Sequence, residues 1–387
     1  MDKFIRLSRD SKGGVATYGN ADRYETIDLL RGLAILLVVI RHVQLRIPFE
    51  KSDLLISVPE QLLSLVFMSG NEGVRIFFVI SGFLITMNCL NRYSELKNVN
   101  VRNFYVSRFA RIAPCLIALL LVLTLLDYIG AKGYIINSKF SYFETVFSAL
   151  TFHLNWLEGQ KGYLPPAWDV LWSLSVEEVF YIAFPIVCLC CRNKNVICAV
   201  LVILILIGPL NRLALEGNKI WQSKAYLSCM DSISIGCLFA VISHNKVLST
   251  LSVHCFSIVG AILVVFILMV KRDPSFGALA ELYLFKTILS FGVGLMLVAS
   301  VRQNLLPWLS RLLSPLALYG RLSYEVYLTH VFVVLAGVRL YKMYDVDLND
   351  SFSFLFGIIL ISALLGYLVE RFFSKPMNAR IRAKYTS

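Results

Sequence analysis

Residues 27–42 read Ile27-Asp-Leu-Leu-Arg31-Gly-Leu-Ala-Ile-Leu-Leu-Val-Val-Ile-Arg-His42, an apolar run typical of a membrane-spanning helix apart from its charged positions. Arg31 and His42 are eleven residues apart. That spacing is about three helical turns, so both side chains lie on one face, about 16 Å apart along the axis. An arginine at the centre of a spanning helix costs about 2.5 to 3.5 kcal/mol and usually faces a protein interior or a water-filled cavity. The pair predicts a functional site within a membrane protein.

The composition excludes an ordinary soluble globule. Hydrophobic residues make up 57% of the 387 residues and charged residues 16%, and the mean hydropathy is +0.70. We therefore expect an all-α, polytopic membrane protein with about ten transmembrane helices and no second folded domain. The expected helices are 27–47, 72–91, 112–130, 171–191, 196–214, 226–243, 250–270, 282–300, 316–338 and 352–370.

The placement of lysine and arginine predicts that both termini are cytoplasmic. With this orientation the inside segments hold 20 basic residues and the outside segments 12. The apolar piece Phe143–Leu157 is then a short interfacial or re-entrant helix, because a full crossing there would invert every later loop. We expect residues 1–25 to be a flexible cytoplasmic tail, 26–376 the transmembrane domain and 377–387 a second cytoplasmic tail. The first helix is not a cleavable signal peptide, since it is long and lacks a small-residue cleavage site.

The net charge of +12 and the nine cysteines predict neither a nucleic-acid site nor a metal site. The positive charge follows the inside loops and tails, where it sets topology and attracts anionic membrane lipids. The cysteines lie in or beside apolar helices, where cysteine acts as a small hydrophobe. We expect no disulfide framework, no zinc pattern and no nucleic-acid partner.

The second and third expected helices carry small residues and arginines. Gly73 and the pair Ser81-Gly82 favour close helix packing in lipid. Arg75 lies near the outer end of the second expected helix. A side chain that reaches the lipid headgroups explains this arginine as well as a functional role does. Arg108 and Arg111 are three residues apart at the cytoplasmic side, so they share a helical face. Paired guanidinium groups suit phosphates, and anchoring to lipid headgroups explains them as well.

Polar and aromatic groups gather in an outer stretch and in the ninth expected helix. Such groups beside a membrane-face cavity resemble a carbohydrate platform, with rings that stack on sugars and carboxylates that accept hydroxyl hydrogen bonds. A charge effect at a helix N-terminus and an aromatic belt are the structural alternatives. The residues are Trp168, Asp169, Trp172, Glu177, Glu178 and Tyr181 in the outer stretch and Tyr327 and His330 in the ninth helix.

These motifs together resemble acyltransferase family 3, the membrane O-acyltransferases that modify O-antigens, exopolysaccharides and related glycans. The resemblance runs from Tyr24 to about Pro376. The matching patterns, in order, are Arg31-x10-His42, Gly73-Val-Arg-Ile-Phe-Phe-Val-Ile-Ser-Gly-Phe-Leu-Ile, Arg108-x-x-Arg111, Trp172-Ser-Leu-Ser-Val-Glu177-Glu-Val-Phe-Tyr181 and Ser323-Tyr-Glu-Val-Tyr327-Leu-Thr-His330. Arg75 stands where many members carry Asp, and Glu325 stands where a small residue is common. The chain is expected to lack the extracellular hydrolase-like domain of fused members.

The resemblance implies an acyl-CoA-dependent enzyme of the bacterial cytoplasmic membrane. The donor, acetyl-CoA, is expected to bind from the cytoplasm with its phosphates near Arg108 and Arg111 and its pantetheine arm passing Arg31. His42, deep in the cavity, is the expected general base or transient acyl carrier. The expected catalytic residues are His42, Arg31 and Glu177, and no metal is expected.

The acceptor is expected to be a lipid-linked or surface glycan at the outer face. Its contacts would come from Trp168, Asp169, Trp172, Tyr181, Tyr327 and His330. A small glycosylated metabolite is the alternative acceptor. A proton-coupled transporter is the competing class, because intramembrane His, Arg and Glu also mark proton relays. The sequence shows no paired interrupted segments in two halves, which disfavours a transporter built from inverted repeats.

Overall fold

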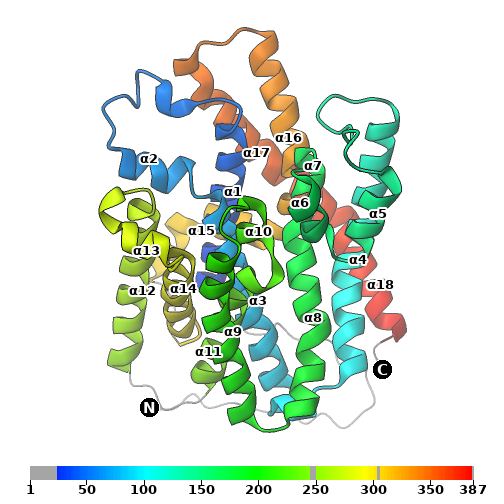
Figure 1. The fold of residues 1–387 in the computed structure, drawn as a ribbon, viewed down its shortest axis with the longest axis vertical. Helices are drawn as coiled ribbons and strands as arrows, with labels where there is room; N and C mark the ends of the chain where they lie inside the picture. The colour runs from blue at the N-terminus through cyan, green and yellow to red at the C-terminus, as the bar shows by residue number, and fades with distance from the viewer. Residues whose placement is uncertain (1–23, 245–249, 303–305, 386–387) are drawn as a thin grey trace.

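The protein is a bundle of long apolar helices (Figure 1). The structure is a computed structural model and describes residues 24–244, 250–302 and 306–385. Within these ranges eight helical spans are long and apolar enough to cross a membrane, or nine if one bent pair is counted as a span. They are built on α3 (Gly70–Tyr93), α4 (Val101–Tyr128), α8 (Leu171–Cys191), α9 (Lys194–Ala214), α11 (Tyr226–His244), α12 (Thr250–Val270), α16 (Ser323–Met343) and α17 (Ser351–Val369). The predicted all-α, polytopic membrane fold is confirmed.

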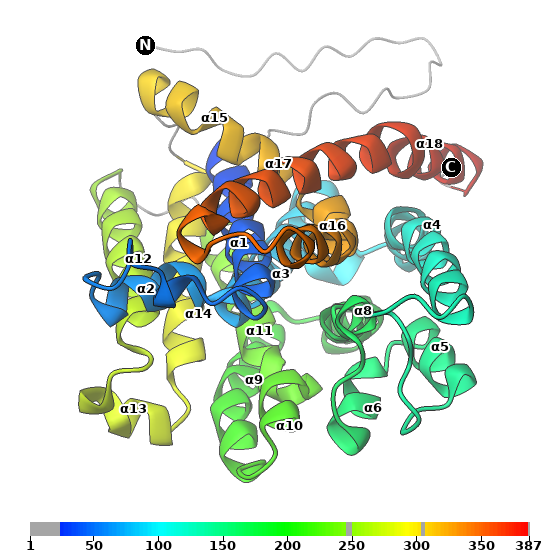
Figure 2. The same cartoon turned by 90° about the horizontal axis from the view of Figure 1, so that it is seen from above.

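The first helix, α1 (Glu25–Gln44), lies inside the bundle although its charges keep it out of these eight spans. It packs against α3, α15 (Pro307–Arg321) and α16. Figure 2 shows α1 near the middle of the molecule, with α4 and α12 at opposite edges. The arginine and histidine of α1 are therefore surrounded by protein rather than by lipid alone. Most of the predicted tail of residues 1–25 lies outside the described residues.

Short helices cap the ends of the bundle. Figure 1 shows α2, α6 and α13 in its upper half, whereas the turns that join α3 to α4 and α8 to α9 lie at the lower end. These two turns, predicted to be inside, thus lie at the end opposite to α2 and α6, predicted to be outside. Which end faces the cytoplasm stays a prediction. The short helices are α2 (Glu60–Phe67), α5 (Tyr142–Leu150), α6 (Leu154–Lys161), α7 (Pro166–Asp169), α10 (Lys219–Lys224), α13 (Gly277–Glu281) and α18 (Lys375–Tyr385).

The apolar piece Phe143–Leu157 does not span the bundle. It divides into α5 and α6, of 9 and 8 residues, at a turn where Phe152 takes a positive φ of 59°. A helix of this length reaches about 13 Å, less than half of a hydrocarbon core of about 30 Å.

The ninth expected helix, 316–338, is wrong as a single element. The chain breaks at Leu322 between α15 and α16, and Figure 2 shows α15 running across the view while α16 is seen nearly end-on. A side-chain carbon at Gly320 would collide with the carbonyl oxygen of Asp28, and one at Gly32 would collide with that of Leu316. This close crossing of α15 over α1 needs glycine on both helices, and it fixes the direction of α15 independently of α16.

Glycines pack the second expected helix as predicted. A side-chain carbon at Gly73 would press on the carbonyl of Ala34 in α1, and one at Gly82 would collide with that of Ile233 in α11. The packing role assigned to these two glycines is confirmed. All nine cysteines lie in the described part of the chain, and each is a free thiol.

Arg75 does not reach toward the headgroups, so that interpretation is wrong. Its side chain is buried, and its Nη1 lies 3.4 Å from Oδ1 of Asp231 and donates to the carbonyl of Ser228 at 2.7 Å. Arg212 reaches the other oxygen of Asp231 at 2.8 Å. One carboxylate between two guanidinium groups ties α3, α9 and α11 together inside the bundle.

The first turn of α14 (Phe285–Ser300) joins the same cluster through Thr287, whose hydroxyl donates to Asp231 at 2.7 Å. The helical segment Pro274–Glu281 comes just before α14, and the two are bent by 88° relative to each other. The carbonyl of Tyr283 in this bend accepts from Arg212 at 3.1 Å. Arg212 therefore also satisfies a backbone carbonyl at the bend that precedes α14.

Candidate active site

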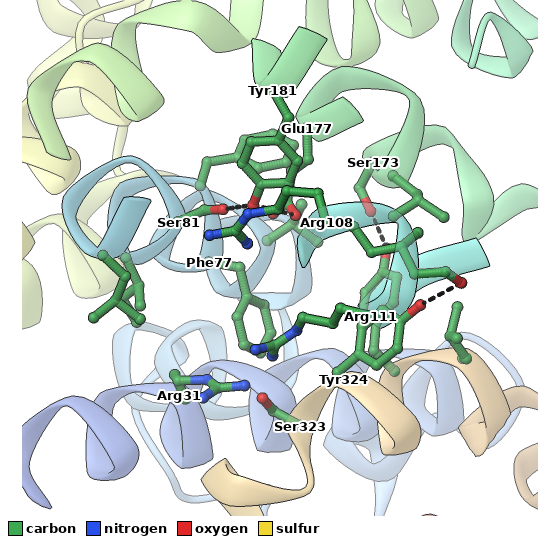
Figure 3. A pocket seen from close by; sticks show the side chains of 18 of the residues that line it. Arg31, Phe77, Ser81, Arg108, Arg111, Ser173, Glu177, Tyr181, Ser323 and Tyr324 are labelled. Carbon is green, nitrogen blue, oxygen red and sulfur yellow. Dashed lines mark hydrogen bonds between the residues drawn. The ribbon is translucent and has the colours of Figure 1, made fainter. Parts of the chain in front are cut away.

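A cavity lies between α1, α3, α4, α8 and α16, and it holds about 980 Å³ of empty space, including the part open to solvent (Figure 3). Three arginines from two helices line it. The lining residues that carry polar groups are Arg31, Ser81, Asn88, Arg108, Arg111, Ser173, Glu177, Tyr181, Ser323, Tyr324 and Tyr327. The three arginines expected at the donor lie together here. Glu177, Tyr181 and Tyr327, which were expected on the acceptor side, line the same cavity.

The arginines of α4 reach the cavity because this helix begins earlier than expected. Asn100 caps it by accepting from the backbone N–H of Asn103 at 2.9 Å, so the helix starts at Val101 and includes both arginines. Arg108 lies over the ring of Tyr181 at 4.7 Å, and Arg111 lies over the ring of Tyr324 at 5.8 Å. Stacking on aromatic rings holds each guanidinium in place without using its hydrogen-bond donors.

These two arginines keep their donors available to a ligand. In the part of the chain that the structure describes, no carboxylate forms an ion pair with Arg108 or Arg111 within 4.0 Å. Arg31 lies 3.9 Å from Asp28, one turn earlier on α1. Figure 3 shows Arg31 and Arg111 reaching the same space from α1 and α4. The cavity therefore presents concentrated positive charge to an anionic ligand.

Glu177 lies at one corner of this cavity, together with the hydroxyl groups of two other residues. The hydroxyl of Tyr181 donates to Oε2 of Glu177 at 3.3 Å and also contacts the hydroxyl of Ser81. The neighbouring Glu178 is buried, and its Oε1 has no hydrogen-bond partner among the described residues. Glu177 thus lies with the arginines, and it faces their charge rather than the histidine of α1.

A pair of histidines lies beyond the cavity. The rings of His42 and His330 are 5.0 Å apart between centroids and meet edge to face. His330 is fully buried, and its Nδ1 lies 2.8 Å from the carbonyl of Tyr327. This contact makes Nδ1 the donor and leaves Nε2 as an acceptor. Nε2 of His330 and Nδ1 of His42 are both buried without a hydrogen-bond partner among the described residues.

Tyr327 stands between the cavity and the histidines. Its ring is 5.9 Å from that of His330 and 6.3 Å from that of Phe77, which also lines the cavity. Its hydroxyl is 2.6 Å from that of Ser173 and donates to the carbonyl of Val170 at 2.9 Å. The sequence placed His42 deep in the same cavity as Arg31, but His42 does not line it. Tyr327, which lines the cavity, is the residue whose ring contacts that of His330.

The acidic and aromatic residues of the outer stretch surround a buried lysine. Lys224 donates to Oε2 of Glu158 at 2.7 Å and to Oδ1 of Asp169. Its ammonium group also lies 5.4 Å from the ring centre of Trp172 and 4.7 Å from that of Tyr163. Asp169 and Trp172 are thus both engaged with Lys224.

Trp168 is packed inside the protein. It is fully buried, and its indole nitrogen donates to the carbonyl of Tyr134 at 3.1 Å. This contact anchors α7 to the loop after α4. In this structure the ring face of Trp168 is covered by protein, unlike that of Tyr163, which is 58% exposed at the same end of α8.

Two residues near the histidines were missed by sequence reasoning. Glu158 and Lys224 lie in polar outer segments, where single charges are ordinary, and nothing in their spacing marks them as partners. They meet across 66 positions of the chain only because α6 and α10 pack together. Ser81 and Tyr324 also line the cavity, and both lie inside motifs quoted above. Their position on the helix relative to the other motif residues was the signal that could have identified them.

The comparison with known proteins is consistent with this arrangement. The acyltransferase domain family matches residues 24–371. A provisionally named O-acetyltransferase of Staphylococcus aureus (strain COL) is 30% identical over 166 residues, which cover 42% of this chain and 24% of that protein. The O-acetyltransferase OatA of Staphylococcus aureus (strain NCTC 8325 / PS 47) is 24% identical over 334 residues, covering 80% of this chain and 53% of OatA.

The chain therefore spans between about a quarter and about half of the length of these two relatives. No solved structure matches the chain. The family match covers nearly all of the helices that form the cavity and the histidine pair. The chain is an integral membrane protein that belongs to the acyltransferase 3 family.

Proposed function

We propose that this protein is a membrane O-acetyltransferase that moves an acetyl group from acetyl-CoA to a hydroxyl of a cell-surface glycan, such as O-antigen or exopolysaccharide. We place it in the bacterial cytoplasmic membrane. The observation that carries the proposal is a cavity that has Arg31, Arg108 and Arg111 on its wall and whose lining residue Tyr327 contacts the His42–His330 pair.

The arginines support an acyl-CoA donor. Coenzyme A carries several phosphate groups, and guanidinium groups bind phosphate through paired, charge-assisted hydrogen bonds. Arg108 and Arg111 lie close to the lower end of the bundle, where α4 begins, and their donors are not taken by carboxylates. The proposal assigns this end to the cytoplasm, where acyl-CoA is made. Arg31 would then contact the part of the donor that reaches further in.

His42 would act as the general base. The acceptor oxygen attacks the carbonyl carbon of the thioester, the carbon–sulfur bond breaks, and coenzyme A leaves as a thiolate. His42 takes the proton from the acceptor hydroxyl and then delivers it to the thiolate sulfur. The buried Nδ1 of His42, which has no hydrogen-bond partner among the described residues, supports this role. The thioester must pass Phe77 and Tyr327 to reach it, so the hydroxyl contacts of Tyr327 have to yield.

The acceptor side is assigned to the other end of the bundle. Trp172, Asp169 and the exposed Tyr163 lie there around Lys224. Aromatic rings and carboxylates are the groups that bind sugars. The names of the two relatives support the acetyl group and the ester linkage. The glycan itself is inferred from the chemistry of this end and from the family resemblance.

Mass spectrometry of surface glycans tests the acceptor. Cells with the gene should carry acetyl esters, 42 mass units each, that are missing from cells without it, and the His42→Ala variant should not restore them. Acetylated small glycosides in place of acetylated surface glycan would move the proposal to the alternative acceptor. Transport of a glycan or metabolite without any new ester would contradict the enzyme.

A further inference from the structure

His330 is the buried neighbour of His42, and the function proposed so far gives it no chemical task. Its side chain is fully buried on α16. The centre of its ring lies 5.0 Å from that of His42 on α1, and the two ring planes make an angle of 67°. The helices α1 and α16 pack against each other at this point of the bundle. A phenylalanine could supply the same ring packing, so the nitrogens of His330 need an explanation of their own.

The backbone of α16 fixes which nitrogen of His330 carries a hydrogen. Nδ1 lies 2.8 Å from the carbonyl oxygen of Tyr327 and 3.1 Å from that of Val326. A carbonyl oxygen only accepts hydrogen bonds, so Nδ1 is the donor and Nε2 of the neutral ring is a bare acceptor. Nε2 is buried and has no hydrogen-bond partner among the described residues. An unpaired buried acceptor costs free energy, so a ring that served packing alone would be better without it.

His42 has a nitrogen that needs such an acceptor during the reaction. Its Nδ1 is also buried without a hydrogen-bond partner among the described residues. In the proposed transfer the O–H bond of the acceptor hydroxyl breaks and an N–H bond forms on His42. The imidazolium that results carries a hydrogen on both ring nitrogens. Whichever nitrogen takes the proton, Nδ1 of His42 ends this step as a buried N–H donor, and a buried donor without an acceptor is costly.

His330 lies where it can accept from this donor. A hydrogen bond joins two heavy atoms about 3 Å apart, and the two ring radii account for the rest of a 5.0 Å separation between ring centres. The hydroxyl of Tyr327, the other polar group beside His330, already contacts Ser173 and the carbonyl of Val170. Nε2 of His330 is uncharged, so it can accept from an imidazolium without opposing its positive charge.

We propose that His330 is a positioning residue whose Nε2 accepts a hydrogen bond from Nδ1–H of His42 when His42 takes the acceptor proton. This bond holds the orientation of the His42 ring and stabilises its charged form while the acceptor oxygen attacks the thioester. When the proton passes to the thiolate sulfur, His42 becomes neutral again. The inference rests on the proposed acetyl transfer, and it adds one residue that acts through His42.

The test measures kcat and the KM for acetyl-CoA with the full-length protein in liposomes. His330→Phe keeps a ring of similar size and removes both nitrogens. Its kcat should fall about 10- to 100-fold, the range that a hydrogen bond to a charged group supplies. The KM for acetyl-CoA should stay within about threefold of that of the parent protein, because the proposed donor site is formed by the arginines and not by His330.

The two amide variants of His330 separate the roles of its two nitrogens. In His330→Asn the amide nitrogen can take the place of Nδ1 and keep the backbone contact, but nothing replaces Nε2. The longer side chain of His330→Gln can bring its amide oxygen to the place of Nε2, where it accepts a hydrogen bond. The kcat of His330→Gln should therefore exceed that of His330→Asn by about fivefold or more. A role limited to the backbone contact predicts the reverse order.

His254→Phe is the control, because His254 is exposed on α12 and does not line the cavity. Its kcat should equal that of the parent protein. An unchanged kcat in His330→Phe would overturn the inference, and so would a kcat of His330→Asn equal to or above that of His330→Gln. If His330→Phe does not fold, the comparison of the two amide variants decides alone. Absence of acetyl transfer by the parent protein would contradict the proposed function itself, whereas transfer that is insensitive to His330 would contradict only this inference.

Discussion

The chemistry of the site depends on a few polar side chains enclosed by apolar helices. Arg31 and His42 were recognisable from the sequence because both are costly in a membrane helix and share one face. The neighbours of these two side chains could not be predicted, because they belong to helices that are distant in the sequence. The structure gives Arg31 a cavity with Arg111, and it gives His42 a second histidine, His330, 288 positions later in the chain.

Replacement of His42 by alanine should lower acetyl transfer by at least about 100-fold, because general-base help typically contributes 10² to 10⁴ in rate. The release of coenzyme A by purified protein measures this. His153→Ala is the matched control, since the ring of His153 contacts Ser148, Thr151 and Phe147 in and beside the turn between α5 and α6. An unchanged rate in His42→Ala, with the protein still folded, would remove His42 from the chemistry.

Replacement of Arg108 by alanine should act on donor binding. Hydrogen bonds to charged groups contribute about 1.5 to 3 kcal/mol, so we expect the KM for acetyl-CoA to rise about 10- to 100-fold. Arg102→Ala is the control, because Arg102 is exposed on the same helix and does not line the cavity. Equal KM values for the two variants would show that the cavity arginines do not hold the donor.

At the scale of elements, the sequence predicts helices better than it predicts their ends and breaks. Hydropathy locates most spans within a few residues, since burial in lipid requires long apolar runs. It joined α15 to α16 because Leu316 to Val338 contains no proline or polar run strong enough to mark a break at Leu322. The break follows from the crossing of α15 over α1, which is a tertiary contact.

The Gly320→Ala substitution should destabilise the protein by about 1 to 3 kcal/mol, because the added methyl group would meet the backbone of Asp28. Thermal unfolding in detergent measures the effect. Gly357→Ala on α17 is the control, since nothing lies within 4 Å of the position its methyl group would take. Equal melting temperatures for the two variants would mean that the α1–α15 crossing is not tightly packed.

The cluster around Asp231 should be the most sensitive charged site for folding. Asp231→Asn leaves Arg75 and Arg212 buried without their shared carboxylate, and removal of one partner from a buried ion pair costs about 3 to 5 kcal/mol. We expect low yield and a lower melting temperature. A yield equal to that of Glu144→Gln, which breaks an exposed pair, would contradict this role.

At the scale of the whole molecule, the bundle separates two chemical environments. Tyr327 lines the arginine cavity and contacts His330. The turns that join α3 to α4 and α8 to α9 lie at the end opposite to α2 and α6. The apolar runs of the sequence predict this alternation, because each run crosses the membrane once. The charge bias predicts which end is cytoplasmic, and that orientation stays a prediction. The sequence could not reveal the barrier at Tyr327, which depends on contacts with Phe77, Ser173 and Val170.

The orientation is testable with cysteine labelling in a cysteine-free variant. Tyr344→Cys, in the turn before α17, should react with a membrane-impermeant maleimide in intact bacterial cells. Asn98→Cys, in the turn before α4, should react only after the membrane is opened. Both positions are exposed, so accessibility does not limit the reaction. The reverse pattern would invert the predicted topology and place the arginine cavity toward the outside.

The central claim is that one acetyl group passes from a donor at the arginine cavity to an acceptor at the histidine pair. The most direct measurement uses liposomes that hold the purified protein in one orientation, with labelled acetyl-CoA on the side of Arg108 and a surface glycan on the other side. We predict labelled ester on the glycan, lost in both His42→Ala and the Arg108→Ala, Arg111→Ala double variant. Label transfer that persists in these variants, or that requires donor and glycan on the same side, would contradict the account.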